Sequence, residues 1–134
     1  MVSWKNVRML IAAATRRIGL ELGSPEMAAL EMTVMEMCRL TNDRFDADRA
    51  VAVIATYEFD PASLASAKNG DDVLGMSIRH KECDLWRGKF RFLSTGMRRL
   101  VTRARELGAT TVAHRNAATV YALIGYAIRV GNAD

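Results

Sequence analysis

Two cysteines and two histidines are the side chains with the clearest capacity for chemistry in this sequence. His80 and Cys83 stand three residues apart, which would place them on one face of a helix. With Cys38 and His114 they have the ligand types of a tetrahedral zinc site. Structural zinc sites bring their ligands in close pairs, however, and Cys38 and His114 each stand alone. We therefore expect no metal site and no cofactor.

The two thiols, Cys38 and Cys83, are too few for the disulfide framework of a small secreted protein. We expect both to be free in a reducing compartment, with at least one of them buried. A single bridge between them is the alternative. Both histidines neighbour cationic residues, so we expect His80 and His114 on the solvated surface.

The usual signatures of enzymes are missing from the chain. It has no phosphate-binding loop of the GxxxxGK[ST] type, no GxGxxG, no GxSxG and no HExxH. Nothing in the sequence marks either cysteine as an activated nucleophile. We therefore expect a protein that is not an enzyme and has no catalytic residues, although a site assembled from scattered residues would leave no such signature.

The most distinctive chemistry lies in a basic stretch from Arg79 to Arg105. It holds nine Lys and Arg residues and only two acidic ones, with aromatic rings interleaved among the charges. Arginine forks bind phosphate or carboxylate, and aromatic rings among arginines can stack on nucleic-acid bases. The candidate binding residues are Trp86, Arg87, Lys89, Phe90, Arg91, Arg98, Arg99, Arg103 and Arg105.

Charge is divided between two parts of the chain. Residues 21–72 carry four basic and eleven acidic side chains, whereas residues 73–134 carry eleven basic and four acidic ones. This asymmetry can steer the basic part towards an anionic partner. Alternatively, the arginines form a solvated face that is partly neutralised by the acidic part, inside the molecule or across a homo-oligomeric contact.

Apolar periodicity and capping residues predict helices along most of the chain. Ser3 caps a first helix, with Gly23 expected at its C-terminal end, and Ser24-Pro25-Glu26 starts a second that continues to about Thr41. The inward positions of the second helix are Met27, Leu30, Val34, Met37 and Cys38. Its four methionines (Met27, Met32, Met35, Met37) are expected in the core, with an adaptable binding groove as the alternative.

The carboxylates around Asp46 lack the glycine and glutamate of a calcium-binding loop, so Asp46 is expected to cap a third helix from Ala47 to Glu58. Further helices are predicted after Asp60-Pro61 and over about 73–87, and residues 89–92 alternate with the period of a short extended segment. Ser94 or Thr95 is expected to cap the next helix, which ends at Gly108 and buries Met97, Leu100, Val101, Ala104 and Leu107. The last helix is predicted from Thr110 or Thr111 to Gly131.

These elements predict an all-α fold, with residues 1–134 forming a single compact bundle of five or six helices. No apolar run approaches the roughly 20 residues that span a bilayer, so we expect a cytoplasmic protein without membrane contact. The arginines on the helix before Gly108 lie off its apolar stripe and are expected to point to solvent.

Two functions fit this pattern. The first is a non-enzymatic protein that docks its basic surface on an anionic site of a larger assembly that handles nucleic acid, as an inhibitor or adaptor. Phage and plasmid inhibitors of host complexes, anti-CRISPR proteins among them, are an analogy in size alone, since no motif matches such a family. The second is direct DNA or RNA binding by the Arg79–Arg105 stretch. A helix-turn-helix motif is disfavoured there, because the gap between the helices predicted before and after Gly88 is longer than the three to four residues of that motif's turn.

Overall fold

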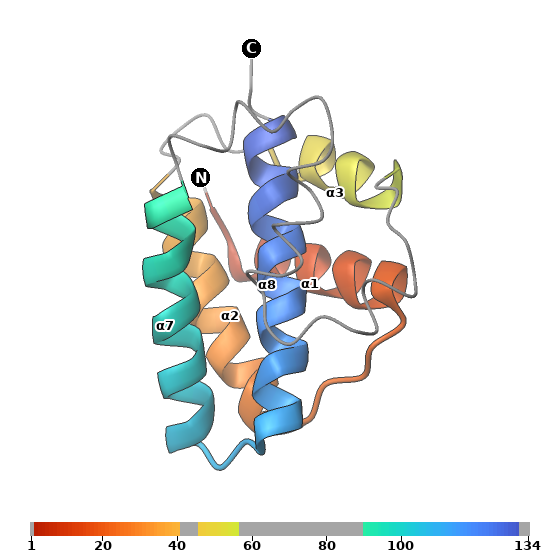
Figure 1. Ribbon diagram of the computed structural model, residues 1–134. Helices are drawn as coiled ribbons and strands as arrows, with labels where there is room; N and C mark the ends of the chain where they lie inside the picture. The colour runs from red at the N-terminus through yellow and green to blue at the C-terminus, as the bar shows by residue number, and fades with distance from the viewer. Residues whose placement is uncertain (1, 41–45, 57–89, 132–134) are drawn as a thin grey trace.

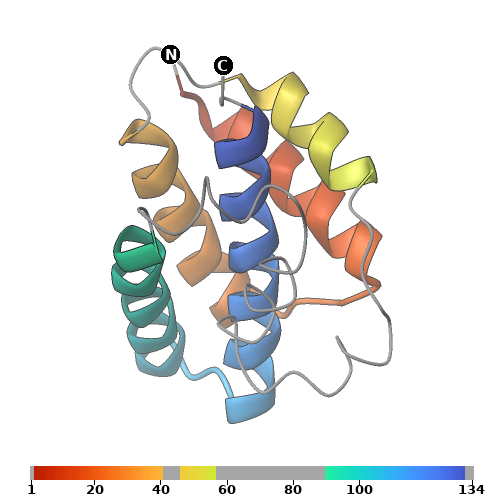
Figure 2. The same ribbon diagram turned by 45° about the horizontal axis from the view of Figure 1, so that its top comes forward.

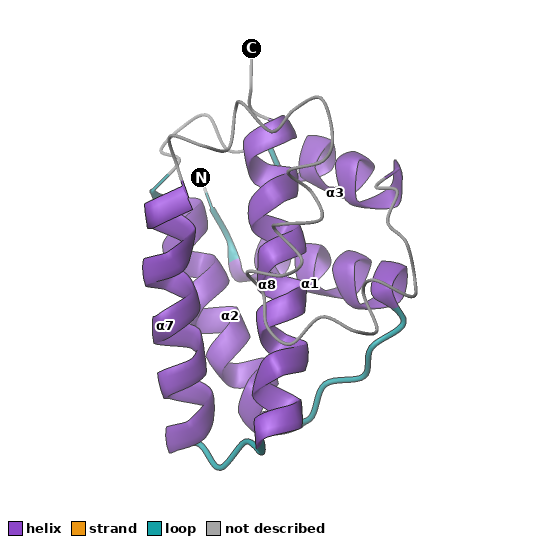
Figure 3. Cartoon of the chain, in the orientation of Figure 1, coloured by secondary structure: helices purple, strands orange, loops and turns teal. Residues whose placement is uncertain are grey.

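The computed structural model describes residues 2–40, 46–56 and 90–131, which form five α-helices and no strand (Figure 3). These are α1 (Trp4–Ile18), α2 (Ser24–Arg39), α3 (Ala47–Thr56), α7 (Phe90–Glu106) and α8 (Thr111–Gly131). The predicted all-α fold is therefore confirmed. The helices expected after Asp60-Pro61 and over 73–87, and the end of the third helix beyond Thr56, lie outside the described residues.

The last helix, α8, is the centre of the bundle and packs against all four other described helices. Figures 1 and 2 show α2 and α7 along one side of α8, and α1 and α3 along the other. α2 runs parallel to α8, while α7 runs antiparallel to both and is joined to α8 by a short turn. Consequently the start of α8 and the end of α7 lie at the same end of the molecule.

The composition of α8 explains its central place. An amphipathic helix has one polar face, but residues 120–128 of α8 are apolar on every side. Its fully or nearly fully buried residues are Ala117, Ala118, Val120, Tyr121, Ala122, Leu123, Ile124, Tyr126, Ala127 and Ile128. They share one hydrophobic core with the inward faces of α1, α2, α3 and α7.

The ends of α1 and α2 follow from local capping. Ser3 caps α1 by accepting a hydrogen bond from the Asn6 N–H at 3.2 Å, as predicted. The expectation that Gly23 ends α1 is wrong, because Gly19 has the left-handed conformation, at φ 79°. Gly23 instead precedes α2 as its N-cap, and its N–H donates to the carboxylate of Glu26.

Within α2 the apolar spacing predicted the buried side correctly for most positions. Leu30, Val34, Met37 and Cys38 are buried, whereas Met27 is only partly buried. The helix ends at Arg39, with Leu40 as its C-cap, slightly before the expected end near Thr41. The prediction that the methionines lie in the core is confirmed for Met35 and Met37, whereas Met32 is 39% exposed.

Two expectations for α7 are wrong. The helix begins at Phe90, so residues 90–92 are helical and not extended, and Ser94 and Thr95 lie inside the helix and not at its start. The alternation over residues 89–92 is too short to exclude a helix. Phe90 and Leu93 precede Met97 and Leu100 at the spacing of three and four residues that is typical of a helix.

The C-terminal end of α7 lies where the glycine predicted it. Gly108 has φ 96°, its N–H donates to the Arg105 carbonyl, and the Ala109 N–H donates to the Ala104 carbonyl. This is the hydrogen-bond pattern of a Schellman motif. Leu107 was expected to be buried but is 48% exposed, because the helical spacing no longer applies where the chain turns away after Glu106.

The predictions for the remaining described ends hold. The Arg49 N–H donates to the Asp46 carboxylate at 3.1 Å, and the Ala113 N–H donates to the Thr110 hydroxyl at 3.2 Å, so Asp46 and Thr110 cap α3 and α8. Among the described helices, none combines the length and apolar composition needed to cross a membrane.

Candidate binding surface on α7 and α8

The four arginines Arg98, Arg99, Arg103 and Arg105 all lie on α7, which is the described part of the predicted basic stretch. Trp86, Arg87 and Lys89 lie outside the described residues, as does His80. Phe90 and Arg91 belong to the first turn of α7, but their side chains are not described.

Two of the four arginines, Arg99 and Arg103, form ion pairs with Glu36 of α2. Arg103 donates to Glu36 Oε1 and, at 3.2 Å, to the hydroxyl of Thr33, which is itself buried. Arg99 Nη1 lies 3.4 Å from Glu36 Oε2. Glu36 therefore bridges two arginines one turn apart. It lies in the acidic part of the chain, so the alternative that this part neutralises some of the arginines is confirmed for Arg99 and Arg103.

This pairing divides the basic face of α7. The Arg103 side chain is only 29% exposed, so the expectation that it points to solvent is wrong. Arg98 and Arg105 are exposed, and neither forms an ion pair with another described side chain. With Thr102 they stand at spacings of four and three, which places them on one outward stripe of α7.

A close contact between α7 and α8 lies beside the Glu36 cluster. Gly96 of α7 faces the buried phenol of Tyr121 so closely that a Cβ there would lie 1.8 Å from the hydroxyl oxygen. Burial raises the pKa of the Tyr121 phenol, and the charges of Glu36 and Cys38 act in the same direction, against Arg99. Tyr121 is therefore a packed core residue that stays protonated, and it is not a candidate base.

His114 was expected on the surface, and the structure contradicts this. It is only 6% exposed, and neither ring nitrogen has a hydrogen-bond partner among the described residues. It shares one helical face with the buried Ala117, Ala118 and Tyr121, three, four and seven residues further on, whereas adjacent Arg115 points elsewhere and is exposed. That spacing was the available sequence signal, and the charge of a chain neighbour was the wrong guide.

Burial of His114 has a consequence for stability. Desolvation lowers its pKa, and the nearby cations Arg105 of α7 and Arg115 of α8 lower it further. In the unfolded chain, His114 binds a proton below the ordinary histidine pKa of about 6.5, whereas in the folded protein the same residue binds a proton only at lower pH. Above the ordinary pKa both states are neutral at this residue, so we expect the free energy of unfolding to fall as the pH drops below about 6.5.

Urea unfolding at several pH values between 8 and 5.5 measures this effect. We expect H114L to lose part of the pH dependence, since leucine has no proton to bind. His80 is present in both proteins, so the difference between them isolates His114. Equal pH dependence in the two proteins would show that the buried imidazole is not responsible.

The described residues do not assemble the zinc tetrad. Cys38 is buried in the last turn of α2, and His114 lies near the start of the parallel helix α8, so the two occupy opposite ends of the bundle. Burial raises the pKa of the Cys38 thiol to about 12, which disfavours the nucleophilic thiolate. No group of three or more His, Cys, Asp or Glu side chains in the described ranges is placed to hold a metal ion. Cys83 lies outside these ranges.

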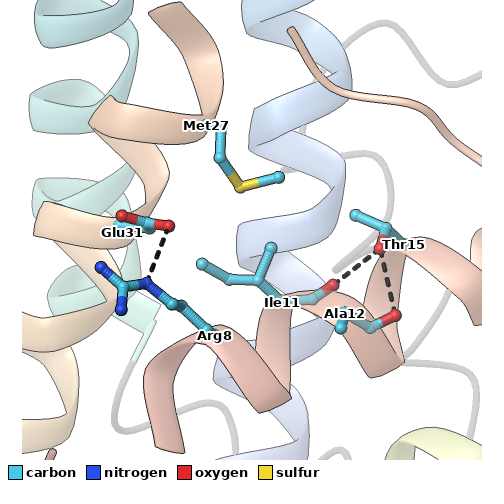
Figure 4. Close-up of a pocket in the computed structure, with 6 residues that line it drawn as sticks. All are labelled: Arg8, Ile11, Ala12, Thr15, Met27 and Glu31. Carbon is cyan, nitrogen blue, oxygen red and sulfur yellow. Dashed lines mark hydrogen bonds and ion pairs between the residues drawn. The ribbon is translucent and has the colours of Figure 1, made fainter. Parts of the chain in front are cut away.

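A groove of about 280 Å³ lies between α1 and α2 (Figure 4). Ile11, Ala12 and Met27 contribute apolar surface, and the Thr15 hydroxyl already donates to carbonyls of its own helix. The charged side chains among the described residues that line the groove are Arg8 and Glu31, which pair with each other at 3.4 Å. Because its polar groups are committed and its volume is below that of common ligand pockets, roughly 300–1,000 Å³, the groove is the weaker candidate.

Comparison of the chain with protein-family models, with curated proteins and with solved structures gives no significant match. The class of the protein is therefore defined by its own fold and surface. It is an all-α protein with a core built around α8 and an exposed row of arginines on α7.

Proposed function

We propose that this protein is a non-enzymatic binding module that docks the outward face of α7 on an anionic surface of a larger protein assembly, as an inhibitor or adaptor. The observation that supports this most directly is the division of the arginines. Glu36 pairs with both Arg99 and Arg103, while Arg98 and Arg105 remain exposed on one stripe. That the assembly handles nucleic acid is part of the proposal and rests on the analogy with small helical inhibitors.

The small number of exposed cations on the described part of α7 and the start of α8 supports a protein partner over direct nucleic-acid binding. Affinity for duplex DNA rises with the number of phosphates that are neutralised, and strong non-specific binders contact roughly six to ten. Among the side chains that the structure describes on α7 and the start of α8, the exposed cations are Arg98, Arg99, Arg105 and Arg115, and Arg99 already has a carboxylate partner. Direct binding of DNA or RNA is the alternative proposal.

Affinity capture with charge-matched variants tests the proposed function. The immobilised protein is exposed to nuclease-treated lysate of its source organism, and retained proteins are quantified for wild type, R98Q/R105Q and K5Q/R16Q. Lys5 and Arg16 are exposed cations on α1, so both variants lose the same charge. We expect R98Q/R105Q to reduce retention of a specific protein at least tenfold, while K5Q/R16Q retains it. Equal retention by all three proteins contradicts the use of α7.

Anisotropy with labelled duplex DNA, single-stranded DNA and RNA at two salt concentrations tests the alternative. Phosphate binding on duplex DNA weakens with a log–log slope of roughly −0.9 per neutralised phosphate. Tight, salt-steep binding that R98Q/R105Q abolishes would favour the nucleic-acid alternative. The double variant R98Q/R105Q is a better test than substitution of all four arginines that the structure describes on α7. The fourfold substitution would also remove Arg99 and Arg103, the two partners of Glu36.

A further inference from the structure

The turn between α7 and α8 exposes two large apolar side chains. Leu107 directly follows α7 and is 48% exposed, and Val112 in the first turn of α8 is 67% exposed. Both flank the short turn, at the end of the molecule where these two helices meet (Figure 1). Single exposed apolar residues are common on protein surfaces. Here two of the most exposed ones border the same turn.

The turn does not need these two side chains for its own stability. A Schellman motif is often completed by an apolar contact of the residue after the glycine. Ala109 fills that role, since it packs against the core, and Thr110 supplies the helix cap. Leu107 and Val112 therefore remain available for a contact outside the chain.

Two exposed arginines lie close to this apolar pair. Arg105 is in the last turn of α7 and Arg115 follows the first turn of α8, so both border the turn that Leu107 and Val112 flank. The first turn of α8 contains no acidic side chain, so the positive end of the helix dipole is not compensated by one there. Glu106 is an exposed acidic residue of this region, and the two arginines outnumber it.

We propose that the turn end, defined as Arg105, Leu107, Val112 and Arg115, is the docking site for a protein segment that carries both carboxylates and large apolar side chains. This inference rests on the proposed function and names its contact surface and partner chemistry. Carboxylates complement Arg105 and Arg115, and apolar side chains bury Leu107 and Val112. Interfaces combine apolar anchors with surrounding arginines in this way.

A nucleic-acid backbone would match only half of this surface. Phosphates pair with arginine, but a phosphate backbone has no large apolar group that could bury Leu107 and Val112. Apolar side chains that contact nucleic acid generally wedge between base steps, and such wedges are large and project into a groove. The combination of charges and apolar side chains therefore points to a protein partner.

Two labelled peptides of 18 residues provide the test. Both contain the same number of glutamates, and one has leucines at helical spacing where the other has serines. Fluorescence anisotropy at low salt measures the affinity of each for wild type, L107S/V112S, R98Q/R105Q and M32S/L40S. Met32 of α2 and Leu40, the C-cap of that helix, are 39% and 62% exposed and serve as the matched control.

We expect wild type to bind the leucine-containing peptide about tenfold more tightly than its serine counterpart, as burial of two apolar side chains implies. L107S/V112S should abolish this preference and leave the weaker binding of the serine peptide unchanged. M32S/L40S should behave as wild type. Thermal unfolding of each variant checks that the surface substitutions leave the fold intact.

Three outcomes overturn the inference. They are equal affinity for the two peptides, a preference that survives in L107S/V112S, and absence of binding to either peptide. If R98Q/R105Q still reduces partner retention in the capture experiment, the proposed function stands and only the turn end is wrong. Duplex DNA that outcompetes both peptides regardless of Leu107 and Val112 would instead support the nucleic-acid alternative.

Discussion

Replacing Gly96 by alanine will destabilise the protein, although alanine is the better helix former. Helix propensity alone predicts a gain of about 0.8–1 kcal/mol for this change in the interior of α7. Packing opposes it, because the new Cβ would lie 1.8 Å from the Tyr121 hydroxyl and 2.7 Å from the ring carbon that bears it. Tyr121 is 1% exposed and cannot move without disturbing the core. We expect a net loss of about 1–3 kcal/mol in urea unfolding.

A double-mutant cycle with Y121F identifies the cause. Phenylalanine removes the closest contact but leaves the ring carbon, so G96A should cost distinctly less in the Y121F background without becoming neutral. Gly108→Ala is the control, since Gly108 has φ 96° and open space around it. Its cost comes from backbone strain and should be the same in both backgrounds. A stabilising G96A would mean that α7 and α8 do not approach as closely as described.

Replacing Glu36 by glutamine will weaken the fold and strengthen anion binding together. The carboxylate holds both Arg99 and Arg103, and the Glu36 and Arg103 side chains are about one-third exposed, at 33% and 29%. Charge-assisted hydrogen bonds at such a partly buried site exceed the value of a surface pair. We expect the free energy of unfolding to fall by about 1–2 kcal/mol. The released arginines should raise affinity for an anionic probe such as heparin roughly threefold.

Glu31→Gln provides a matched control. It makes the same change in net charge on the same helix, but the described partner of Glu31 is Arg8, whose side chain is 63% exposed. An exposed pair of this kind contributes about 0–1 kcal/mol. E31Q should therefore stay close to wild type in stability and bind heparin less well than E36Q does. Identical behaviour of E31Q and E36Q would show that the Glu36 cluster has no special role.

Local sequence signals determined most of the described helices. The caps Ser3, Asp46 and Thr110 and the stop at Gly108 were predictable because each acts on backbone groups within about four residues. The errors at Gly23 and at the start of α7 are boundary errors of the same local kind. At Gly23 two glycines competed for one role, and only the backbone conformation of Gly19 decides between them.

The candidate surface was only partly predictable. Sequence placed the arginines on one helix and off its apolar stripe, which holds for Arg98 and Arg105. The capture of Arg99 and Arg103 by Glu36 joins residues 63 and 67 positions apart in the chain. A charge count along the chain showed that acidic and basic parts exist, but it cannot show which side chains meet.

The sequence by itself thus determined that this is an all-α protein with a basic helix near its C-terminal end, because apolar period, caps and charge are properties of neighbouring residues. Tertiary structure decided which of those charges remain available. The packing of α7 against α2 brings Glu36 to Arg99 and Arg103, and its packing against α8 places Tyr121 against Gly96. The same packing buries His114 at the start of α8. These contacts depend on how whole helices dock, and that is set by the shape of the shared core.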